Sequence, residues 1–301
     1  MININRMKHM IEFLLISIFD KPLSLGPAAL ISFDVESPID SPTKDIVSAR
    51  SVGIKNRIGL KRIIDVSKTY ETPFTLFSTG HALLKECDGH KIIINVLRGC
   101  KNHGLHAGKY YWHEIDPASD YIEHPEFYFG DLVEEAIKSG IKHEIASHSF
   151  SHIPYSLVDD ETAIRDLKMS TEALNIHGLR TRSFAFPFNL VGKLYLLSRM
   201  GIRIARIGHR VLRSLSYKDK VLMVKTHITD LDISSSNILI KIMNSMVKRK
   251  MLLSWCLHAI TFYDDRTFKL FEEIMKYLIK KEVNFLTFND LYELLLSECC
   301  F

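Results

Sequence analysis

The chain has 301 residues, of which 47% are hydrophobic and 25% charged, values that indicate a folded globular protein and exclude a disordered one. The formal net charge is only +4 and the basic residues are scattered, which favours solvated helix surfaces over nucleic-acid binding. The five cysteines are odd in number and show no Cys-x-x-Cys spacing, which favours reduced thiols and a cytoplasmic location over a disulfide scaffold.

Residues 1–27 are expected to form a separate N-terminal segment. The apolar run Ile11–Phe19 is much shorter than the ~20 residues needed to span a bilayer. Glu12 interrupts it, and no small-x-small cleavage site follows, which argues against a signal peptide. Leu14 and Leu15 instead indicate a short amphipathic helix that packs on the main domain, with peripheral contact to a membrane surface as the alternative.

From residue 28 to residue 298, strand-like and helix-like segments alternate, which predicts a single α/β domain. The predicted strands are Ala29–Phe33, Pro73–Ser78, Glu144–Ser147, Ser183–Phe186, Ile202–Ala205, Val221–Thr226, Leu252–Leu257 and Asn284–Leu286. The predicted helices are Leu60–Thr69, Phe129–Ser139, Asp160–Ile176, Val191–Met200, Asn237–Lys248 and Arg266–Lys280. Asp159 can cap the helix Asp160–Ile176, and Gly178 can end it.

Two acids stand at the end of the first predicted strand, where Asp34 and Glu36 follow a buried apolar run and Pro38 stops it. Because side chains alternate along a strand, both acids should point the same way. In a parallel α/β sheet the carboxyl ends of the strands form the ligand-binding edge. One acid could therefore bind a metal and the other act as a base, whereas the simpler alternative is that both cap a loop.

Two histidines, His148 and His152, lie four residues apart in the run Ser-His-Ser-Phe-Ser-His. On one helical turn this spacing puts the two imidazoles side by side, with Cβ atoms roughly 5–6 Å apart. Two such nitrogens can bind one divalent metal ion. The small serines around them predict a rim open to water. A solvated helix face without metal is the alternative.

An aromatic-rich stretch at about residues 103–130 breaks the alternation of strands and helices. It contains Tyr111 and Trp112, and Pro117 and Pro125 interrupt it. Long insertions of this kind usually carry or cover a function. We expect it to form a wall of a substrate cleft, in which Tyr111 and Trp112 stack on sugar rings. A lid packed for stability is the alternative.

The motifs taken together resemble the polysaccharide deacetylase family, whose members share the NodB homology domain and are also called carbohydrate esterase family four. The resemblance runs from about Leu30 to about Leu296. It includes an acidic-Val-Glu form of the first motif, which marks a less studied branch. The segments that carry it are SFDVE at 32–36, TPFTLFSTGHAL at 72–83, SHSFSH at 147–152, SFAFPFN at 183–189, and Leu257-His258.

This resemblance implies a distorted (β/α) barrel and a metal-dependent hydrolase that removes an N-acetyl group from an amino-sugar-containing glycan or glycolipid. It implies a divalent metal, zinc by default, bound by Glu36, His148 and His152. Asp34 would be the general base, and His258 would protonate the leaving amine.

The Phe-Pro motif of the family would supply one side of the groove. Here that motif is Phe186-Pro187, so both residues are expected to contact substrate.

The sequence departs from the family pattern at three places. The first motif has Asp34-Val35-Glu36 in place of two adjacent aspartates, so the two acids could exchange roles. The motif arginine that pairs with the base is replaced by Phe188 or Ala185, with Arg182 as the candidate substitute.

Ala259 stands where a proline usually follows the late histidine. These losses leave two alternatives open: a non-catalytic carbohydrate-binding relative, and a hydrolase of a non-sugar amide, as in allantoinase-like relatives.

Overall fold

The structure is a computed structural model that describes residues 24–38, 45–89, 92–96, 108–112, 115–208, 214–233 and 236–299. Most of the predicted N-terminal segment, up to residue 23, lies outside the described residues, as do residues 103–107 and 113–114 of the aromatic-rich stretch. The packing of the N-terminal segment therefore stays a prediction.

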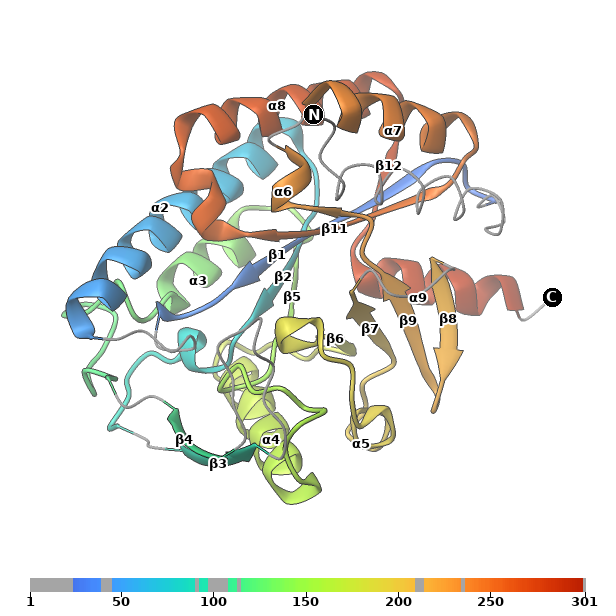
Figure 1. Ribbon diagram of the computed structural model, residues 1–301. Coiled ribbons are helices and arrows are strands. Elements are labelled where there is room, and N and C mark those ends of the chain that lie inside the picture. The colour runs from blue at the N-terminus through green and yellow to red at the C-terminus, as the bar shows by residue number, and fades with distance from the viewer. Residues whose placement is uncertain are drawn as a thin grey trace, which may run out of the picture.

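A curled sheet of ten described strands forms a half-barrel at the centre of the domain (Figure 1). Its order is β10-β11-β1-β2-β5-β6-β7-β9-β8, with β12 paired to β1. The pairings are parallel except for that of β8 with β9. The strands of this sheet are β1 (Ala28–Val35), β2 (Thr75–Ser78), β5 (Glu144–Ser147), β6 (Ser183–Ala185), β7 (Ile204–Ile207), β8 (Leu215–Lys218), β9 (Val221–Lys225), β10 (Ile228–Thr229), β11 (Leu252–His258) and β12 (Asn284–Phe285).

Helices connect the parallel strands and pack around the half-barrel (Figure 1). The described helices are α2 (Ile46–Tyr70), α3 (Gly130–Lys138), α4 (Asp160–Ile176), α5 (Leu194–Arg199), α6 (Asp230–Ile233), α7 (Ser236–Lys248), α8 (Asp265–Lys280) and α9 (Phe288–Cys299). Three short 3-10 turns that matter below are η2 (His81–Leu83), η4 (Pro187–Asn189) and η5 (Ala259–Tyr263). The predicted α/β barrel with one domain is thus confirmed.

A separate two-stranded ribbon interrupts the strand–helix alternation between β2 and α3. Its strands are β3 (Ile92–Val96) and β4 (Gly108–Trp112), which pair antiparallel. Of the two strands, only β4 lies within the aromatic-rich stretch. At the end of that stretch Phe127, Tyr128 and Phe129 are at most 1% exposed, so these three rings pack in the core.

The alternation of β1 divides the core into an outer and an inner part. Phe33 faces outward and meets Phe271 of α8 at 5.8 Å between ring centroids. Leu30 faces inward, in a cluster that also contains residues of β2, β5, β6, β7, β9 and β11. Side chains from so many strands can meet only on the concave side of a curled sheet.

Helix α9 contributes Phe288 and Leu291 to that inner cluster, and Phe288 contacts Phe77 of β2 at 5.0 Å. The apolar part of the interior is filled in this way. The next inward residue of β1, Ser32, is already polar, and Asp34 follows it on the same side. The half-barrel therefore has a packed apolar interior that becomes polar toward the carboxyl end of β1.

Helix α2 begins fourteen residues before the predicted start at Leu60. Asp45 caps it, accepting a hydrogen bond from the backbone N–H of Ser48 at 2.7 Å. The first half of α2, which was not predicted, contains Gly53 and Gly59, and glycine has a low helix propensity. A Cβ added to Gly59 would lie 1.8 Å from the backbone oxygen of Ala259, so this glycine allows α2 to pack directly against η5.

Candidate active site

Asp34 and Glu36 project from the end of β1 toward the same place, as strand alternation predicts. Asp34 lies opposite His258 of β11 in the parallel register. The side chain of Asp34 is 4% exposed and that of Glu36 is 18% exposed. The acid pair therefore forms the floor of a site at the carboxyl edge of the sheet, with Glu36 nearer to solvent.

The two histidines lie in the segment that follows β5, and this segment is not a helix, contrary to the sequence prediction. Ser149 has φ +72° and His152 has φ +54°, so two left-handed residues fold the chain back on itself. The ring centroids of His148 and His152 come within 4.9 Å of each other. A tight loop thus produces the side-by-side imidazoles that a helical turn was expected to give.

The prediction of a water-exposed rim around the histidines is also wrong. Ser147, Ser149 and Ser151 are at most 2% exposed. The carboxylate of Asp166, on the inner side of α4, accepts hydrogen bonds from the backbone N–H groups of Phe150 and Ser151 at 3.0 and 2.9 Å.

The same carboxylate accepts hydrogen bonds from the hydroxyls of Ser149 and Tyr155 at 2.7 and 2.8 Å. The Ser149 hydroxyl and two backbone N–H groups of this loop thus bond to one buried carboxylate. Asp166 therefore fixes the backbone that carries both imidazoles.

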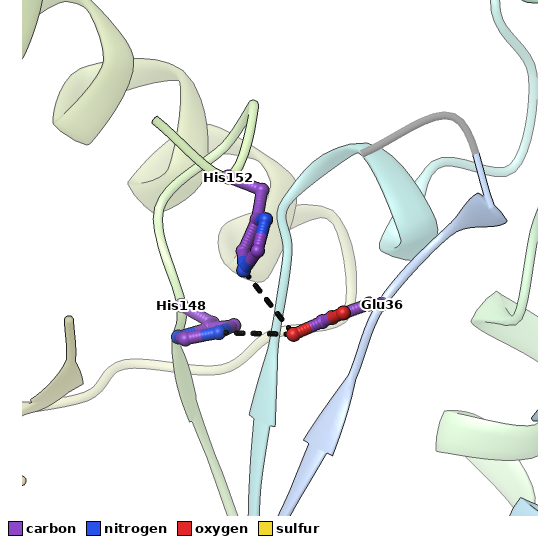
Figure 2. A group of neighbouring side chains, drawn as sticks. All are labelled: Glu36, His148 and His152. Carbon is purple, nitrogen blue, oxygen red and sulfur yellow. Dashed lines mark ion pairs between the residues drawn. The ribbon is translucent and has the colours of Figure 1, made fainter. Parts of the chain in front are cut away.

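Figure 2 shows that His148, His152 and Glu36 point toward one another across β2, which lies between β1 and β5. Glu36 Oε1 lies 3.4 Å from His148 Nε2 and 3.2 Å from His152 Nε2. Burial alone would raise the pKa of Glu36, but His152 and the hydrogen bonds from both histidines hold that pKa well below its usual range. Glu36 is therefore an anion facing two ring nitrogens.

These three residues fit a divalent metal ion. His148 Nδ1 lies 2.9 Å from the backbone carbonyl of Ala185, to which it can only donate, so the lone pair of a neutral imidazole is on Nε2. A histidine ligand whose other nitrogen is held in this way is the usual arrangement at metal centres. Two imidazoles and one carboxylate form a normal ligand set for zinc that leaves a position for substrate or water.

Asp34 is paired with Arg206, a residue that the sequence prediction missed. Arg206 Nη2 lies 2.6 Å from both carboxylate oxygens of Asp34 and donates to Oδ2. Arg206 Nη1 donates to Ser32 Oγ at 2.9 Å, and the guanidinium lies over the Phe77 ring. Burial alone would raise the pKa of Asp34, but Arg206, His148 and His258 outweigh it and lower the pKa. Asp34 is thus held ionised.

The suggestion that Arg182 replaces the motif arginine is wrong. Arg182 is 53% exposed and forms an ion pair with Glu293 of α9. Arg206 belongs to β7 and is the register partner of Ala185 of β6. Ala185 is one of the two positions at which the arginine was expected. The neighbouring strand therefore supplies the guanidinium that the motif strand lacks.

His258, at the end of β11, lies on the other side of the acid pair. Its Nε2 is 3.7 Å from Asp34 Oδ2 and 3.8 Å from Glu36 Oε1. Its Nδ1 donates to Asp230 Oδ2 at 2.6 Å, and Asp230 also accepts from the His258 backbone N–H at 3.0 Å. Asp230, the first residue of α6, was not predicted.

Burial lowers the pKa of His258, but the hydrogen bond to Asp230 and the charges of Glu36, Asp230 and Asp34 raise it to about 10. The imidazole is therefore protonated at neutral pH. Its side chain is 40% exposed, the most open of the site residues. An oriented, charged histidine at an open edge can donate a proton to a leaving group.

The Phe-Pro segment follows β6 and carries one ring into the site. Phe188 has φ +57° and its ring centroid lies 4.4 Å from that of His152. Phe186 is 1% exposed and packs against Phe184 at 5.1 Å, and Pro187 is buried as well. Phe188, and not Phe186 or Pro187, is therefore the residue of this segment whose ring lies beside the proposed metal ligands. Substrate contact by Phe186 and Pro187 stays a prediction.

The two aromatic residues expected to stack on sugar belong to β4. Tyr111 is the register partner of Ile93, and Trp112 is that of Ile92. Their contact with substrate stays a prediction.

Comparisons with known proteins agree with the fold and with the motifs. Residues 57–205 match the family model described as Polysaccharide deacetylase. A solved structure from Mycobacterium smegmatis, provisionally identified as a polysaccharide deacetylase, is similar at 14% identity and a TM-score of 0.65, covering 93% of this chain and 94% of that chain. Puue allantoinase is similar at 13% identity and a TM-score of 0.59, covering 86% and 87% of the two chains.

Peptidoglycan deacetylase PdaC from Bacillus subtilis matches at 14% identity and a TM-score of 0.49, covering 91% of this chain and 93% of that chain. No curated protein matches the chain in sequence. At these identities the solved structures bear on the fold alone.

Among the helices that the structure describes, none combines the length and apolar character needed to cross a membrane. The resemblance to the polysaccharide deacetylase family that the motifs indicate is confirmed by the match to the family model over residues 57–205, and the similar solved structure confirms the fold.

Proposed function

We propose that this protein is a metal-dependent carbohydrate deacetylase that hydrolyses the N-acetyl group of an amino-sugar-containing glycan or glycoconjugate. The family match supports carbohydrate deacetylation. The proposed metal dependence and mechanism rest on one observation: three side chains of metal-ligand type lie together, next to an ionised acid and a protonated histidine. Glu36, His148 and His152 form the ligand group, and Asp34 and His258 flank it.

Glu36, His148 and His152 would hold the ion, with zinc as the default. When bound, a divalent ion supplies Lewis-acid polarisation of the amide carbonyl and of water. Asp34 takes the proton of the attacking water, because Arg206 keeps its carboxylate ionised at neutral pH. The guanidinium also orients that carboxylate toward the site.

His258 donates a proton to the nitrogen as the C–N bond breaks. Amide cleavage needs this proton because an unprotonated amine anion is a very poor leaving group. The hydrogen bond to Asp230 fixes the ring so that Nε2 faces the acids, and it keeps the imidazole charged until it is used. His258 Nε2 lies 3.7 Å from Asp34 Oδ2 and 3.8 Å from Glu36 Oε1, so the acid and the base are neighbours beside the ligand group. A cytoplasmic location and peripheral membrane contact stay proposals.

The proposal is tested by incubating zinc-loaded full-length protein with N-acetylated glycan oligomers, lipid-linked N-acetyl sugars and allantoin. Released acetate is measured for the sugars, and ring opening for allantoin. We expect acetate release from at least one N-acetyl sugar, and release at least about 10²-fold slower from the Asp34→Asn variant. Ring opening of allantoin without acetate release would replace the proposal with a ureide hydrolase. Tight sugar binding with intact metal but no acetate would replace it with a binding protein.

A further inference from the structure

A second group of metal-ligand side chains lies outside the candidate active site. His81 belongs to η2, which directly follows β2, Cys87 lies six residues further on, and Asp116 follows the β3–β4 hairpin. His81 Nε2 is 3.0 Å from Asp116 Oδ2 and 3.6 Å from Cys87 Sγ, and Cys87 Sγ is 3.1 Å from Asp116 Oδ2. A nitrogen, a sulfur and an oxygen atom, each able to bind a metal ion, therefore lie close together. We call these three residues the hairpin-base cluster.

We propose that the hairpin-base cluster binds a structural divalent metal ion, zinc or a similar borderline ion, that ties together both ends of the hairpin insertion. A tetrahedral zinc ion with bonds of about 2.0–2.3 Å holds its ligand atoms roughly 3.3–3.5 Å apart. The observed separations are within a few tenths of an ångström of that spacing. Imidazole nitrogen, thiolate sulfur and carboxylate oxygen are the three ligand types that zinc accepts in proteins.

The surroundings of Asp116 support a ligand role for its second oxygen. Asp116 Oδ1 accepts hydrogen bonds from the Tyr128 hydroxyl at 2.5 Å and from the Ala118 backbone N–H at 3.0 Å. These bonds turn Oδ2 toward His81 and Cys87. Outer hydrogen bonds of this kind orient carboxylate ligands at metal centres.

A cysteine–histidine–aspartate catalytic triad does not explain the arrangement. In a triad the nucleophile and the acid contact different nitrogens of the imidazole. Here Cys87 and Asp116 both meet Nε2 of His81. The side chains of His81 and Asp116 are 0% and 3% exposed, and Cys87 is 3% exposed, so substrate has no access to the thiol. Burial of all three ligand side chains fits a structural ion, and a water molecule would complete the four-coordinate shell.

The position of the cluster in the chain gives the ion its role. In the sequence, β3 and β4 lie between Cys87 and Asp116. One ion would therefore close that insertion at its base. His81 also connects the cluster to the loop His148–His152, called the histidine loop, because the Gly80 and His81 N–H groups donate to the carbonyls of Ser149 and Phe150 at 2.8 and 3.2 Å.

The test uses cobalt(II) as the probe on metal-stripped full-length protein. Cobalt bound to a thiolate gives a sulfur-to-metal charge-transfer band, which the Glu36–His148–His152 group cannot produce because it has no sulfur. We expect two cobalt ions per chain and a thiolate band. The band should persist in His148→Ala, which removes only the active-site ion, so the outcome does not depend on the proposed function.

Cys87→Ser should lose the band and one ion per chain, because the hydroxyl keeps the hydrogen bonds but is a poor ligand. The matched control is Cys256→Ser, a second buried cysteine, which should keep the band. Asp116→Asn keeps the side-chain shape and should weaken cobalt binding at this site at least about tenfold. One ion per chain with no band in the wild type, or a band that survives Cys87→Ser, would show that the cluster is only hydrogen bonded.

Discussion

The domain holds two groups of histidine and acid side chains, and their surroundings differ. Glu36, His148 and His152 lie at an edge where Glu36 is 18% exposed, beside Asp34 and a histidine that is 40% exposed. The hairpin-base cluster is closed, with no side chain more than 3% exposed. Two groups of metal-ligand side chains therefore differ in their access to solvent: the first is partly open and the second is buried. Under the two proposals, solvent access and the neighbouring proton donors and acceptors, rather than the ligand set itself, distinguish the reactive centre from the structural one.

The largest effect should follow loss of an active-site ligand. His148→Ala and His152→Ala should each remove the active-site ion and reduce deacetylation to background while the protein stays folded. His81→Gln should act oppositely, costing about 1–3 kcal/mol of unfolding free energy but leaving turnover largely intact. Metal content, acetate release and urea unfolding are measured on all three. If His81→Gln abolished turnover as fully as His148→Ala, the division between the two groups would collapse.

Asp34→Asn should keep the active-site ion and lower turnover by about 10²–10⁴-fold, because the amide cannot accept the water proton. Glu36→Gln is the matched variant and should lose the ion together with turnover. Bound metal and acetate release distinguish them. Were Asp34→Asn the variant without metal and Glu36→Gln the one that retained it, the two acids would have exchanged roles.

His258→Ala should slow amide cleavage much more than cleavage of an activated acetate ester, by about 10²-fold or more in the ratio of the two rates. The ester leaving group departs without a proton. Because the pKa of His258 is raised to about 10, this acid is charged throughout the neutral range and is lost only as pH rises through that value. Equal slowing of both substrates would remove the proton-donor role.

Arg206→Lys should lower turnover by about 10–10²-fold without loss of metal, because lysine keeps the charge but cannot contact Ser32 and Asp34 together as the guanidinium does. Arg182→Lys is the control and should change turnover less than about twofold, since Arg182 pairs with Glu293 on the surface. Equal losses in both variants would show that the contact with Asp34 is not what matters.

The smallest effect concerns His143, a histidine outside both groups. Its Nδ1 accepts from the Phe74 N–H at 3.1 Å, and its Nε2 lies 2.9 Å from Ser67 Oγ. Ser67 Oγ already donates to the Ile64 carbonyl, so Nε2 is the donor and the ring is neutral. Burial lowers the pKa of His143 to about 4.

A lowered histidine pKa means that the unfolded chain binds a proton before the folded protein does. Stability from this residue is therefore complete above pH 6.5 and is lost as pH falls from 6.5 to about 4, by about 1–3 kcal/mol. Urea unfolding at pH 7.5 and 4.5 measures the loss, which should be smaller in His143→Gln. An identical loss in the variant would mean that His143 titrates normally.

Sequence predicts the parts of this molecule that depend on local pattern. The helix Asp160–Ile176 and the strand Glu144–Ser147 have the predicted bounds, because capping and apolar periodicity act over a few residues. The direction of Asp34 and Glu36 follows from strand alternation alone. Helix α9 was missed, although Phe288 and Leu291 fill the interior, because its role depends on strands that are distant in sequence.

The partners of the proposed catalytic residues could not be predicted in this way, because they come from other strands and helices. Arg206 reaches Asp34 from β7, which lies four strands from β1 in the sheet order. One signal was present: a charged residue within the apolar run Ile204–Ile207 of a buried strand requires a partner. Asp166 gave a similar signal, as an acid on the buried stripe of α4.

The hydrogen bonds between Asp166 and the histidine loop have a consequence for the local opening of the structure. The amides of Phe150 and Ser151 cannot be released to solvent while this carboxylate stays in place. Their hydrogen–deuterium exchange is therefore set by the opening of α4 and not by fluctuations of an ordinary loop. The backbone beside the imidazoles should rank among the slowest-exchanging parts of the chain, although it has no regular secondary structure.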